Sequence, residues 1–549
     1  MFLIQCAGQS PPPGGPVDTV PPSIVRSVPD SGAVRVQENI ILLEFSEYVD
    51  RRSVEDAIFI SPPVGDVEYD WSGKDLEILL PDTLRSNTTY VVTVGTDVID
   101  QRAKNRMATG HTLAFSTGDS LDRGRMSGRV YDPKPEAVTL FAYRLDPLDA
   151  DTLDPARVKP DYIMQTGRDG RFVFSSLAWG TYRLFAIRDE YRNLLYDRQL
   201  DQFGVFNRDI VLSADNPSVD IVQFQLTKED TTNPFLSGVQ PLDERQIRFR
   251  FSEPVRAPSF DLNNVSVVDT AVGESVPLRA AFLDPLDRSA GGILFGVPLT
   301  HNAVYRLSVT DVSDTAGWPI DPMNASLTFR ASENPDTVAP VFSVISFADT
   351  ILGFPVDRPM TFAFDEPVNR SVFANGLTIS DTGGGTVSLM PEWISPVKVQ
   401  VRPAEKFRFA RTYHLQIVMD SVIDLNGNAR KDSVWGARFT TFNPDRSGEL
   451  EGVTQDLNLS AAGPVVVTVR RISDRKESAL VQDSPGKFHF PELAAGHFVV
   501  TAYRDEDSSG AYTFGLPFPF HPSERFVVGS DTVKVRPRWS VEGVSLIIP

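Results

Sequence analysis

The acidic stretch RDEDSSGAYTFG near the end of the chain carries residue types that could bind a metal ion, because oxygen ligands alternate along it. Asp505, Asp507 and Ser509 occupy alternate positions, and Gly510 follows them where a loop would turn. Such spacing is typical of the first half of a calcium loop, although Leu516 stands where the twelfth, acidic ligand is expected. The stretch therefore predicts either a low-affinity calcium site or a plain acidic hairpin.

A related stretch, RDEYRNLLYD, lies earlier in the chain and carries a weaker form of the same signal. It keeps Asp189 and Asn193 and adds Asp197. The remaining chemistry-bearing residues form no recognisable constellation. The six histidines show no metal-ligand spacing, no phosphate loop or Gly-x-Ser-x-Gly motif occurs, and one cysteine leaves no candidate for thiol catalysis. The sequence thus predicts no enzyme and no cofactor, with calcium as a possible bound ion.

Charge and the position of Cys6 limit the partners. With 53 Lys and Arg against 72 Asp and Glu, the net charge is −19, which disfavours nucleic acid as a partner. The start MFLIQC is apolar, and AGQSPPPGGPVD after it has the composition of a flexible tether. This arrangement resembles a truncated bacterial lipoprotein signal in which Cys6 is lipidated and becomes the mature N-terminus. Residues 1–17 are then signal and tether, and the lipid on Cys6 is the predicted membrane anchor.

One phrase occurs three times in the chain, and its repetition predicts a repeated structural unit. DTVPPSIVRSV, DTTNPFLSGVQ and DTVAPVFSVIS begin at Asp18, Asp230 and Asp336. Each is followed by a strand-like run that ends in Ser-Glu or Asp-Glu, namely ILLEFSE, IRFRFSE and MTFAFDE. The alternation of apolar residues predicts half-buried strands, and proline in the opening phrase suits a linker or an edge strand. Units of about 100 residues with such strands are typical of β-sandwiches.

A later landmark in each unit is an Asp-rich turn before the last strand. The turns read VIDQRAKN, VSDTAGW and VIDLNGN, starting from the first unit. With the opening phrases and the FSEP-like strand ends, these turns resemble the bacterial Ig-like domain first described in surface-layer proteins. The turn at Asp424 fits this pattern best, and Trp318 replaces the usual Asn in the second unit. The turn at Asp100 lacks the glycine, so its geometry must differ.

Two further segments share another pattern, Gly-(Arg/Lys)-Phe-x-Phe-x-x-Leu-x-x-Gly-x-(Tyr/Phe). It spans residues 170–182 and 486–498. The paired Phe residues point to the same face of a strand, and the second glycine suits a turn. This pattern resembles the carboxypeptidase regulatory-like, prealbumin-like sandwich, an accessory domain rather than a protease.

The sequence therefore predicts an all-β protein, a tandem array of five β-sandwich domains joined end to end. The predicted Ig-like domains span residues 18–120, 229–335 and 336–443. The predicted prealbumin-like domains span residues 121–228 and 444–549.

Asp-Thr pairs at the start of each Ig-like unit resemble the tripeptide that Bacteroidota glycosylate on the hydroxyl in exported proteins. The resemblance implies sugars on Thr19, Thr231 and Thr337, which would stiffen the interdomain joints. The alternative is that Asp and Thr simply favour linkers and strand starts.

Two functions from different classes remain open on these grounds. The first is a non-enzymatic envelope lipoprotein, similar to Bacteroidota Ig-like lipoproteins. It would be anchored in the outer membrane and would face either the cell surface or the periplasm. Its domains would form an arm that binds another envelope protein or a matrix component. The second is a carbohydrate-binding accessory subunit of a glycan-processing system. Its candidate sugar-binding residues are the tryptophans Trp71, Trp179, Trp318, Trp393, Trp435 and Trp539.

Overall fold

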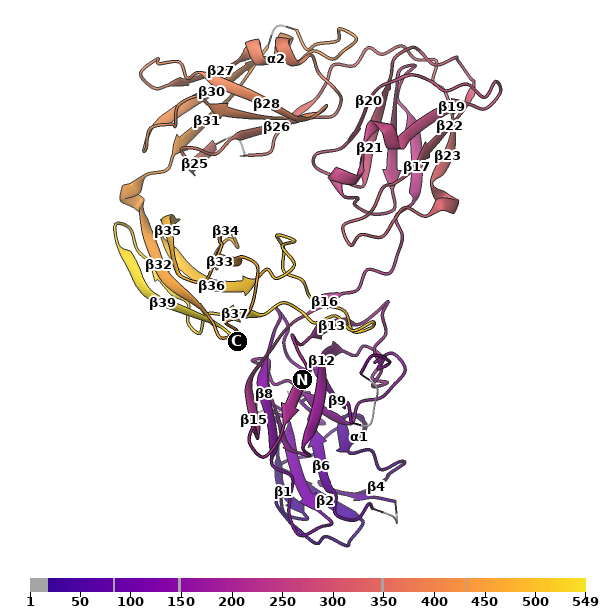
Figure 1. The fold of residues 1–549 in the computed structure, drawn as a ribbon, viewed down its shortest axis with the longest axis vertical. Coiled ribbons are helices and arrows are strands. Elements are labelled where there is room, and N and C mark those ends of the chain that lie inside the picture. Colours follow the sequence, from indigo (N-terminus) through magenta and orange to yellow (C-terminus); the bar gives the residue numbers. More distant parts are fainter. Residues whose placement is uncertain (1–17, 82–83, 147–149, 347–349, 432) are drawn as a thin grey trace, which may run out of the picture.

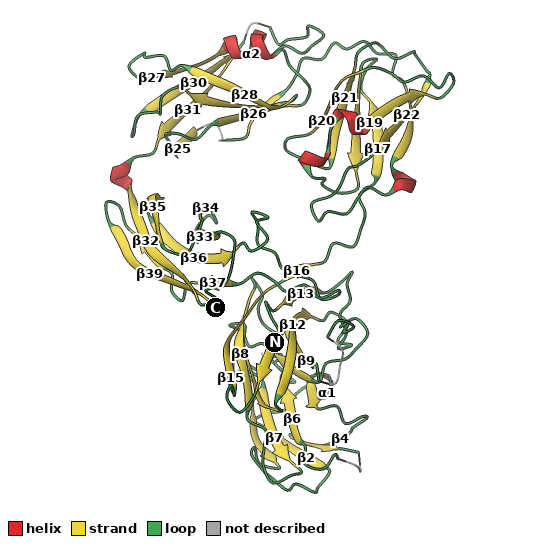
Figure 2. Cartoon of the chain, in the orientation of Figure 1, coloured by secondary structure: helices red, strands yellow, loops and turns green. Residues whose placement is uncertain are grey.

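A computed structural model describes residues 18–81, 84–146, 150–346, 350–431 and 433–549. The chain is almost entirely β-structure, which confirms the predicted fold class, and it contains separate pairs of packed sheets (Figures 1 and 2). We number the modules one to five by the residues 18–120, 121–228, 229–335, 336–443 and 444–549. In the described part of the chain, no helix has the length and apolarity needed to cross a membrane.

Modules one, three and four share one plan, in which a four-stranded sheet packs on a second sheet of three or four strands. In module one, the sheet β1-β2-β5-β4 faces β3-β6-β7. Its elements are β1 (Ile24–Val28), β2 (Ile40–Phe45), α1 (Arg51–Glu55), β3 (Ile58–Ser61), β4 (Glu68–Ser72), β5 (Asp75–Leu79), β6 (Thr89–Val94) and β7 (His111–Ser116).

Module three repeats this arrangement with the sheets β17-β18-β21-β20 and β19-β22-β23. Its elements are β17 (Leu236–Pro241), β18 (Gln246–Phe251), η1 (Ala257–Ser259), η2 (Leu262–Asn264), β19 (Val265–Asp269), β20 (Leu278–Leu283), β21 (Ala290–Phe295), β22 (Val304–Val309), η3 (Pro322–Asn324) and β23 (Ser326–Arg330).

Module four adds one strand, β25, which pairs in parallel with β31 and extends the second sheet to β25-β31-β30-β27. The first sheet keeps the order β24-β26-β29-β28. The elements are β24 (Phe342–Val344), β25 (Thr350–Phe354), β26 (Met360–Phe364), α2 (Arg370–Gly376), β27 (Leu377–Asp381), β28 (Leu389–Ser395), β29 (Lys398–Pro403), β30 (Thr412–Val418), η4 (Met419–Ser421) and β31 (Val434–Thr441).

Modules two and five follow a second plan, in which the last long strand lies parallel to the first. The three-stranded sheets have the orders β11-β8-β15 and β35-β32-β39. The elements of module two are β8 (Gly124–Tyr131), β9 (Thr139–Arg144), β10 (Tyr162–Gln165), β11 (Arg171–Leu177), β12 (Gly180–Arg188), β13 (Gln202–Val205), β14 (Ile210–Leu212), β15 (Ser218–Gln225) and β16 (Thr227–Lys228).

In module five, the second sheet is β34-β33-β36-β37, with β38 also paired to β36. The same central pairing, β9 with β12 and β12 with both β13 and β14, occurs in module two. The elements of module five are η5 (Pro444–Arg446), β32 (Ser447–Asp456), β33 (Val465–Arg471), β34 (Glu477–Gln482), β35 (Lys487–Ala494), β36 (Gly496–Arg504), β37 (Phe526–Val528), β38 (Val533–Val535) and β39 (Ser540–Ile548).

The Phe-x-Phe pairs lie where the sequence pattern predicts, on the buried face of one strand. Phe172 and Phe174 in module two, and Phe488 and Phe490 in module five, are all buried. In both modules the ring centroids of the pair are 6.1 Å apart in an edge-to-face arrangement. The pairs therefore occupy the same place in the two cores.

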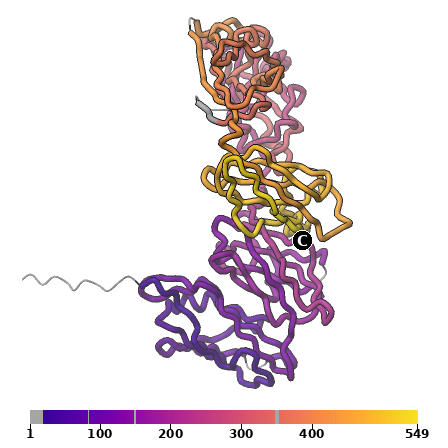
Figure 3. The backbone as a smooth tube through the Cα atoms, turned by 90° about the vertical axis from the view of Figure 1, so that its left-hand side faces the viewer, coloured from indigo at the N-terminus to yellow at the C-terminus, as the bar shows by residue number. Residues whose placement is uncertain are grey.

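The array is not the linear series that the sequence suggested, because module five returns to module two. Figure 1 shows the chain rising through module three, crossing to module four and descending through module five. Figure 3 shows from the side that module five lies directly against module two. The other neighbours also touch, since Arg248 of module three pairs with Asp365 of module four at 3.5 Å. Modules one and two share a core to which Val91 and Ala114 contribute.

Gly128 and Gly452 occupy equivalent positions on the first strand of modules two and five. Each lies opposite the first Phe of its pair and beside the parallel last strand. A Cβ atom at Gly452 would overlap the ring of Phe488 and the carbonyl oxygen of Val544. Both modules thus need glycine here, because ring and backbone fill the space of a side chain.

We predict that Gly452→Ala destabilises module five by about 1–3 kcal/mol, because an extra methyl group is forced into a packed core. Calorimetric melting of the full chain measures the effect. Gly238→Ala is the matched control, since no atom lies within 4 Å of its added Cβ atom. Equal melting of both variants would contradict the close packing at Gly452.

Candidate functional site

One aromatic ring of module five contacts module two, although the two modules are far apart in the sequence. Phe520 lies on the connection between β36 and β37, and its ring covers the guanidinium of Arg183 on β12 at 3.6 Å from the ring centroid. The same ring meets Phe185 edge-on, with the centroids 6.2 Å apart. We call this connection, residues 505–525, the clasp loop.

Arg183 is held in place by module two itself, so it offers a fixed face to the ring. The side chain is buried, and its Nε and Nη2 atoms donate to the two carboxylate oxygens of Asp209 at 2.8 Å each. Its Nη1 atom donates to the carbonyl oxygen of Ala150 at 2.6 Å. The donors thus lie along the guanidinium edge, which leaves the flat face for the cation–π contact with Phe520.

Two further contacts extend the same junction. Arg198 lies over the ring of Phe518 at 5.6 Å and donates to the Phe518 carbonyl oxygen at 3.5 Å. Tyr131 of module two meets Phe526 of module five edge-on, with the centroids 5.6 Å apart. The junction is therefore built from arginine–aromatic and aromatic–aromatic pairs, which are common anchors of protein interfaces.

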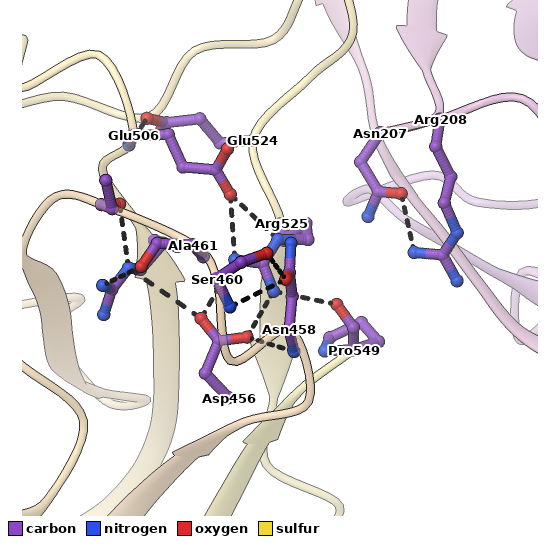
Figure 4. Close-up of polar contacts among 12 residues, drawn as sticks. Asn207, Arg208, Asp456, Asn458, Ser460, Ala461, Glu506, Glu524, Arg525 and Pro549 are labelled. Carbon is purple, nitrogen blue, oxygen red and sulfur yellow. Dashed lines mark hydrogen bonds and ion pairs between the residues drawn. The ribbon is translucent and has the colours of Figure 1, made fainter.

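A cavity of about 870 Å³ lies beside this contact, between the two modules. Module two lines it with Arg208 and the start of β15, and module five lines it with Asp507, Glu524 and Arg525, among others. Figure 4 shows Asn207 and Arg208 on one side and the charged network of module five on the other. The cavity therefore presents both signs of charge.

Arg525 is the centre of the network in module five. It is buried and forms an ion pair with both oxygens of Asp456, and it donates to Glu506 at 2.9 Å (Figure 4). A further donor reaches the carbonyl oxygen of the terminal Pro549 at 3.2 Å. These bonds tie β32 and the chain end to the clasp loop, so the loop is held from the module-five side as well.

Burial and neighbouring charge shift the pKa values of groups that line the cavity. Burial raises the pKa of Glu524 to about 7, and the charges of Asp507 and Asp505 add to the effect, although two backbone N–H groups oppose it. Desolvation and the charge of Arg525 lower the pKa of the Arg208 guanidinium. The cavity thus holds a carboxyl group that titrates near neutral pH.

The predicted calcium residues lie at the edge of this cavity. Oxygens of Asp505, Asp507 and Glu524 lie within 4.8 Å of one another. Both oxygens of Asp505 accept backbone N–H groups of the loop, from Ser509 at 2.9 Å and Gly510 at 3.0 Å. The Ser509 hydroxyl donates to the Ala511 carbonyl oxygen instead of joining the carboxylates. Calcium at this loop stays a prediction.

The structure adds Glu524 to this group, and the sequence analysis missed it. Glu524 lies at the end of the clasp loop, where one oxygen accepts from the Glu506 N–H at 2.8 Å and the other from the Thr513 N–H at 2.9 Å. Only the pairing of loop ends brings it beside Asp505, so no local spacing could have indicated it. The related loop in module two likewise closes on its own backbone, because Asp189 accepts from Asn193 and Leu194.

The predicted glycosylation sites lie apart from the cavity between modules two and five, and the predicted lipidation site, Cys6, lies outside the described residues. Thr19, Thr231 and Thr337 are exposed at the starts of modules one, three and four. Lipidation and glycosylation therefore stay predictions.

The tryptophans divide into packed and exposed groups. Trp71, Trp393 and Trp435 each pack against a phenylalanine ring of their own module. Trp539 is 67% exposed and lines a second cavity of about 470 Å³ between modules four and five. The half-exposed ring of Phe409 lines the same cavity.

Comparison with known protein families identifies bacterial Ig-like domains in the chain. The family model of the bacterial Ig-like domain matches residues 18–117 and 336–441, which are modules one and four. A search of curated proteins found no match.

Several solved structures resemble parts of the chain at low identity. The N-terminal part of the bacterial S-layer protein SbsC matches at 12% identity and a TM-score of 0.17, over 38% of this chain and 44% of that one. An L,D-transpeptidase from Mycobacterium tuberculosis H37Rv matches at 15% identity and a TM-score of 0.13, over 26% of this chain and 48% of that one. Domains 1–6 of SbsC match at 8% identity and a TM-score of 0.16, over 94% and 66%. The chain spans less than half the length of the first two.

We predict that Phe520→Ala separates module five from module two, because the ring supplies both the cation–π contact with Arg183 and the contact with Phe185. Small-angle X-ray scattering of the full chain should show a larger radius of gyration, with the β-sheet circular dichroism unchanged. Phe235→Ala, which removes a half-exposed ring in module three, is the control and should leave the radius unchanged. An unchanged radius for Phe520→Ala would show that this contact does not hold the array closed.

Proposed function

We propose that the chain is a non-enzymatic lipoprotein of the bacterial cell envelope whose modules form a frame for binding another envelope protein or a matrix component. The observation that carries this proposal is the closure of the array, in which the clasp loop joins module five to Arg183 of module two. The bacterial Ig-like match in modules one and four supports a structural or interaction role outside the cytoplasm.

A closed array suits such a role better than a series of modules joined only by flexible linkers. Modules joined only by linkers move freely, and ordering them on a partner costs conformational entropy. Here the junction of modules two and five and the ion pair between Arg248 and Asp365 restrict that motion before any partner binds. Residues from different modules can therefore be presented together as one binding surface.

The lipid anchor on Cys6 belongs to this proposal and is directly testable. In cells that express the protein with a complete lipoprotein signal fused ahead of Cys6, Cys6→Ser should move the protein from the membrane fraction to the soluble fraction. Ser10→Ala in the same tether is the control and should stay with the membrane. A Cys6→Ser protein that remains membrane-bound at high salt would contradict lipid anchoring.

Crosslinking in intact cells, followed by mass spectrometry, tests the partner. The anchored protein should yield a reproducible envelope protein or matrix component, and the yield should fall for the opened variant Phe520→Ala. Recovery of the chain alone would argue against an interaction frame.

The second candidate, a carbohydrate-binding accessory subunit, has one observation in its favour. The exposed rings of Trp539 and Phe409 line the cavity between modules four and five, together with the polar side chains of Glu492 and Arg538. Exposed aromatic faces next to polar groups are suited to stacking on sugar rings.

If this cavity binds glycans, Trp539→Ala should lose at least tenfold in affinity, whereas Trp539→Phe should retain most of it. A glycan array, followed by titration of any hit, measures both. If the wild type, Trp539→Ala and Trp539→Phe bind every glycan equally, the cavity is not a glycan-binding site.

A further inference from the structure

Modules three and four each bring together three acidic residues from distant parts of their sequence, at the joint with the preceding segment. In module three these are Asp230 from the opening phrase, Glu253 after β18 and Asp314 from the turn after β22. One oxygen from each lies within 4.8 Å of the other two. Asp336, Glu366 and Asp424 form the same arrangement in module four.

The equivalence of these positions follows from backbone pairing. The turn aspartate of each module forms an isolated bridge with the valine two residues after the glutamate. These bridges are Val49 with Asp100, Val255 with Asp314 and Val368 with Asp424. The carboxylates therefore meet because the repeated fold places them together, and not because an acidic surface happens to be crowded.

Asp314 gives the cluster of module three an independent indication of a missing ligand. Its side chain is completely buried, and one oxygen, Oδ1, accepts the backbone N–H of Trp318 at 2.8 Å. The other oxygen, Oδ2, is buried without any hydrogen-bond partner in the described part of the chain. A buried carboxylate oxygen with no partner is costly, so a cation at this place would offset a large desolvation penalty.

The surrounding charges do not neutralise this group. None of the ion pairs among the described residues includes Asp230, Glu253 or Asp314, so no Lys or Arg side chain pairs with them. Burial raises the pKa of Glu253, and the charges of Asp230 and Asp314 raise it further. In module one, burial and the charges of Asp18 and Asp100 likewise raise the pKa of Glu47, but there the charge of Lys74 opposes them.

We propose that Asp230, Glu253 and Asp314 bind a calcium ion at the joint between modules two and three. The ligand atoms are all carboxylate oxygens, which suit Ca²⁺ rather than zinc. Two oxygens bound to one Ca²⁺ can lie up to about 5 Å apart, since each Ca–O distance is about 2.3–2.6 Å, and the observed spacing satisfies this limit.

The consequence of binding is a fixed joint. Asp230 lies two residues after β16 of module two, and the other two ligands belong to the body of module three. The linker already touches the turn, because Trp318 Nε1 donates to the Asp230 carbonyl oxygen at 2.8 Å and Asn233 donates to the Pro319 carbonyl oxygen at 2.8 Å. A shared ion would join the linker to module three by its charged side chains as well. This inference is independent of the lipid anchor and of any partner.

Trp318 makes the site observable, because its indole N–H donates to the Asp230 carbonyl oxygen and its backbone N–H donates to the Asp314 carboxylate. Terbium(III) takes calcium sites and emits when a nearby indole is excited. The full chain, freed of metal by a chelator, is titrated with Tb³⁺ and then with Ca²⁺. We expect sensitised emission that Ca²⁺ removes, and a large loss of this emission in Trp318→Phe and in Asp314→Asn.

Isothermal titration with CaCl₂ alone provides the second measurement. We expect a dissociation constant on the order of 0.1–1 mM, the range of extracellular modules. Asp314→Asn should bind one ion fewer than the wild type, or bind it at least tenfold more weakly. Glu274→Gln is the matched control, because Glu274 is an exposed carboxylate of the same module, and it should bind as the wild type does.

Circular dichroism must show that Asp314→Asn is folded, and Glu253→Gln replaces it if it is not. The proposal is overturned if the wild type binds no Ca²⁺ at several millimolar. It is also overturned if the folded variants bind as many ions, with equal affinity, as the control.

Discussion

The stacking of Phe520 on the Arg183 guanidinium is the central contact of the junction that closes the array. Without this junction, which also includes the pairs Arg198–Phe518 and Tyr131–Phe526, modules two to five would be joined only to their sequence neighbours. A single ring is effective here because both the Arg183 guanidinium and the clasp loop are already held in place. Asp209 and Ala150 fix the guanidinium, and the network around Arg525 fixes the clasp loop. Little conformational entropy remains to be lost when the two surfaces meet.

The two kinds of module contribute differently to this arrangement. Modules two and five, which share the parallel first and last strands, make the long-range contact with each other. Modules one, three and four share the Asp-rich turn and the acidic strand end, and they place these groups at joints. The residues that close the array therefore lie on one kind of module, and the acidic clusters at the joints lie on the other.

The acidic joints illustrate how one fold can carry the same charges in different states. In module four, burial and the neighbouring carboxylates raise the pKa of Glu366 to about 9, so the proton is retained at neutral pH when no cation is present. In module one, the carboxylate of Asp100 is satisfied by the backbone of its own turn, because its two oxygens accept the N–H groups of four residues that follow it. Lys104 adopts a positive φ of 60° there, which replaces the glycine that the turn lacks. Equivalent acidic residues of the Ig-like modules thus differ in the hydrogen-bonding and charged groups that surround them.

Much of the fold could be predicted from the sequence, because strands and repeats leave local patterns. Alternating apolar residues indicated the strands, and the Phe-x-Phe pairs indicated the cores of modules two and five. The five-part order of the array followed from the two repeated patterns. The tertiary structure alone decided which residues meet across long separations. The contact of Phe520 with Arg183, the approach of Glu524 to Asp505 and the cluster of Asp230, Glu253 and Asp314 depend on strand register and module packing. No local spacing encodes such contacts, since each joins segments whose separation in the sequence has no fixed period.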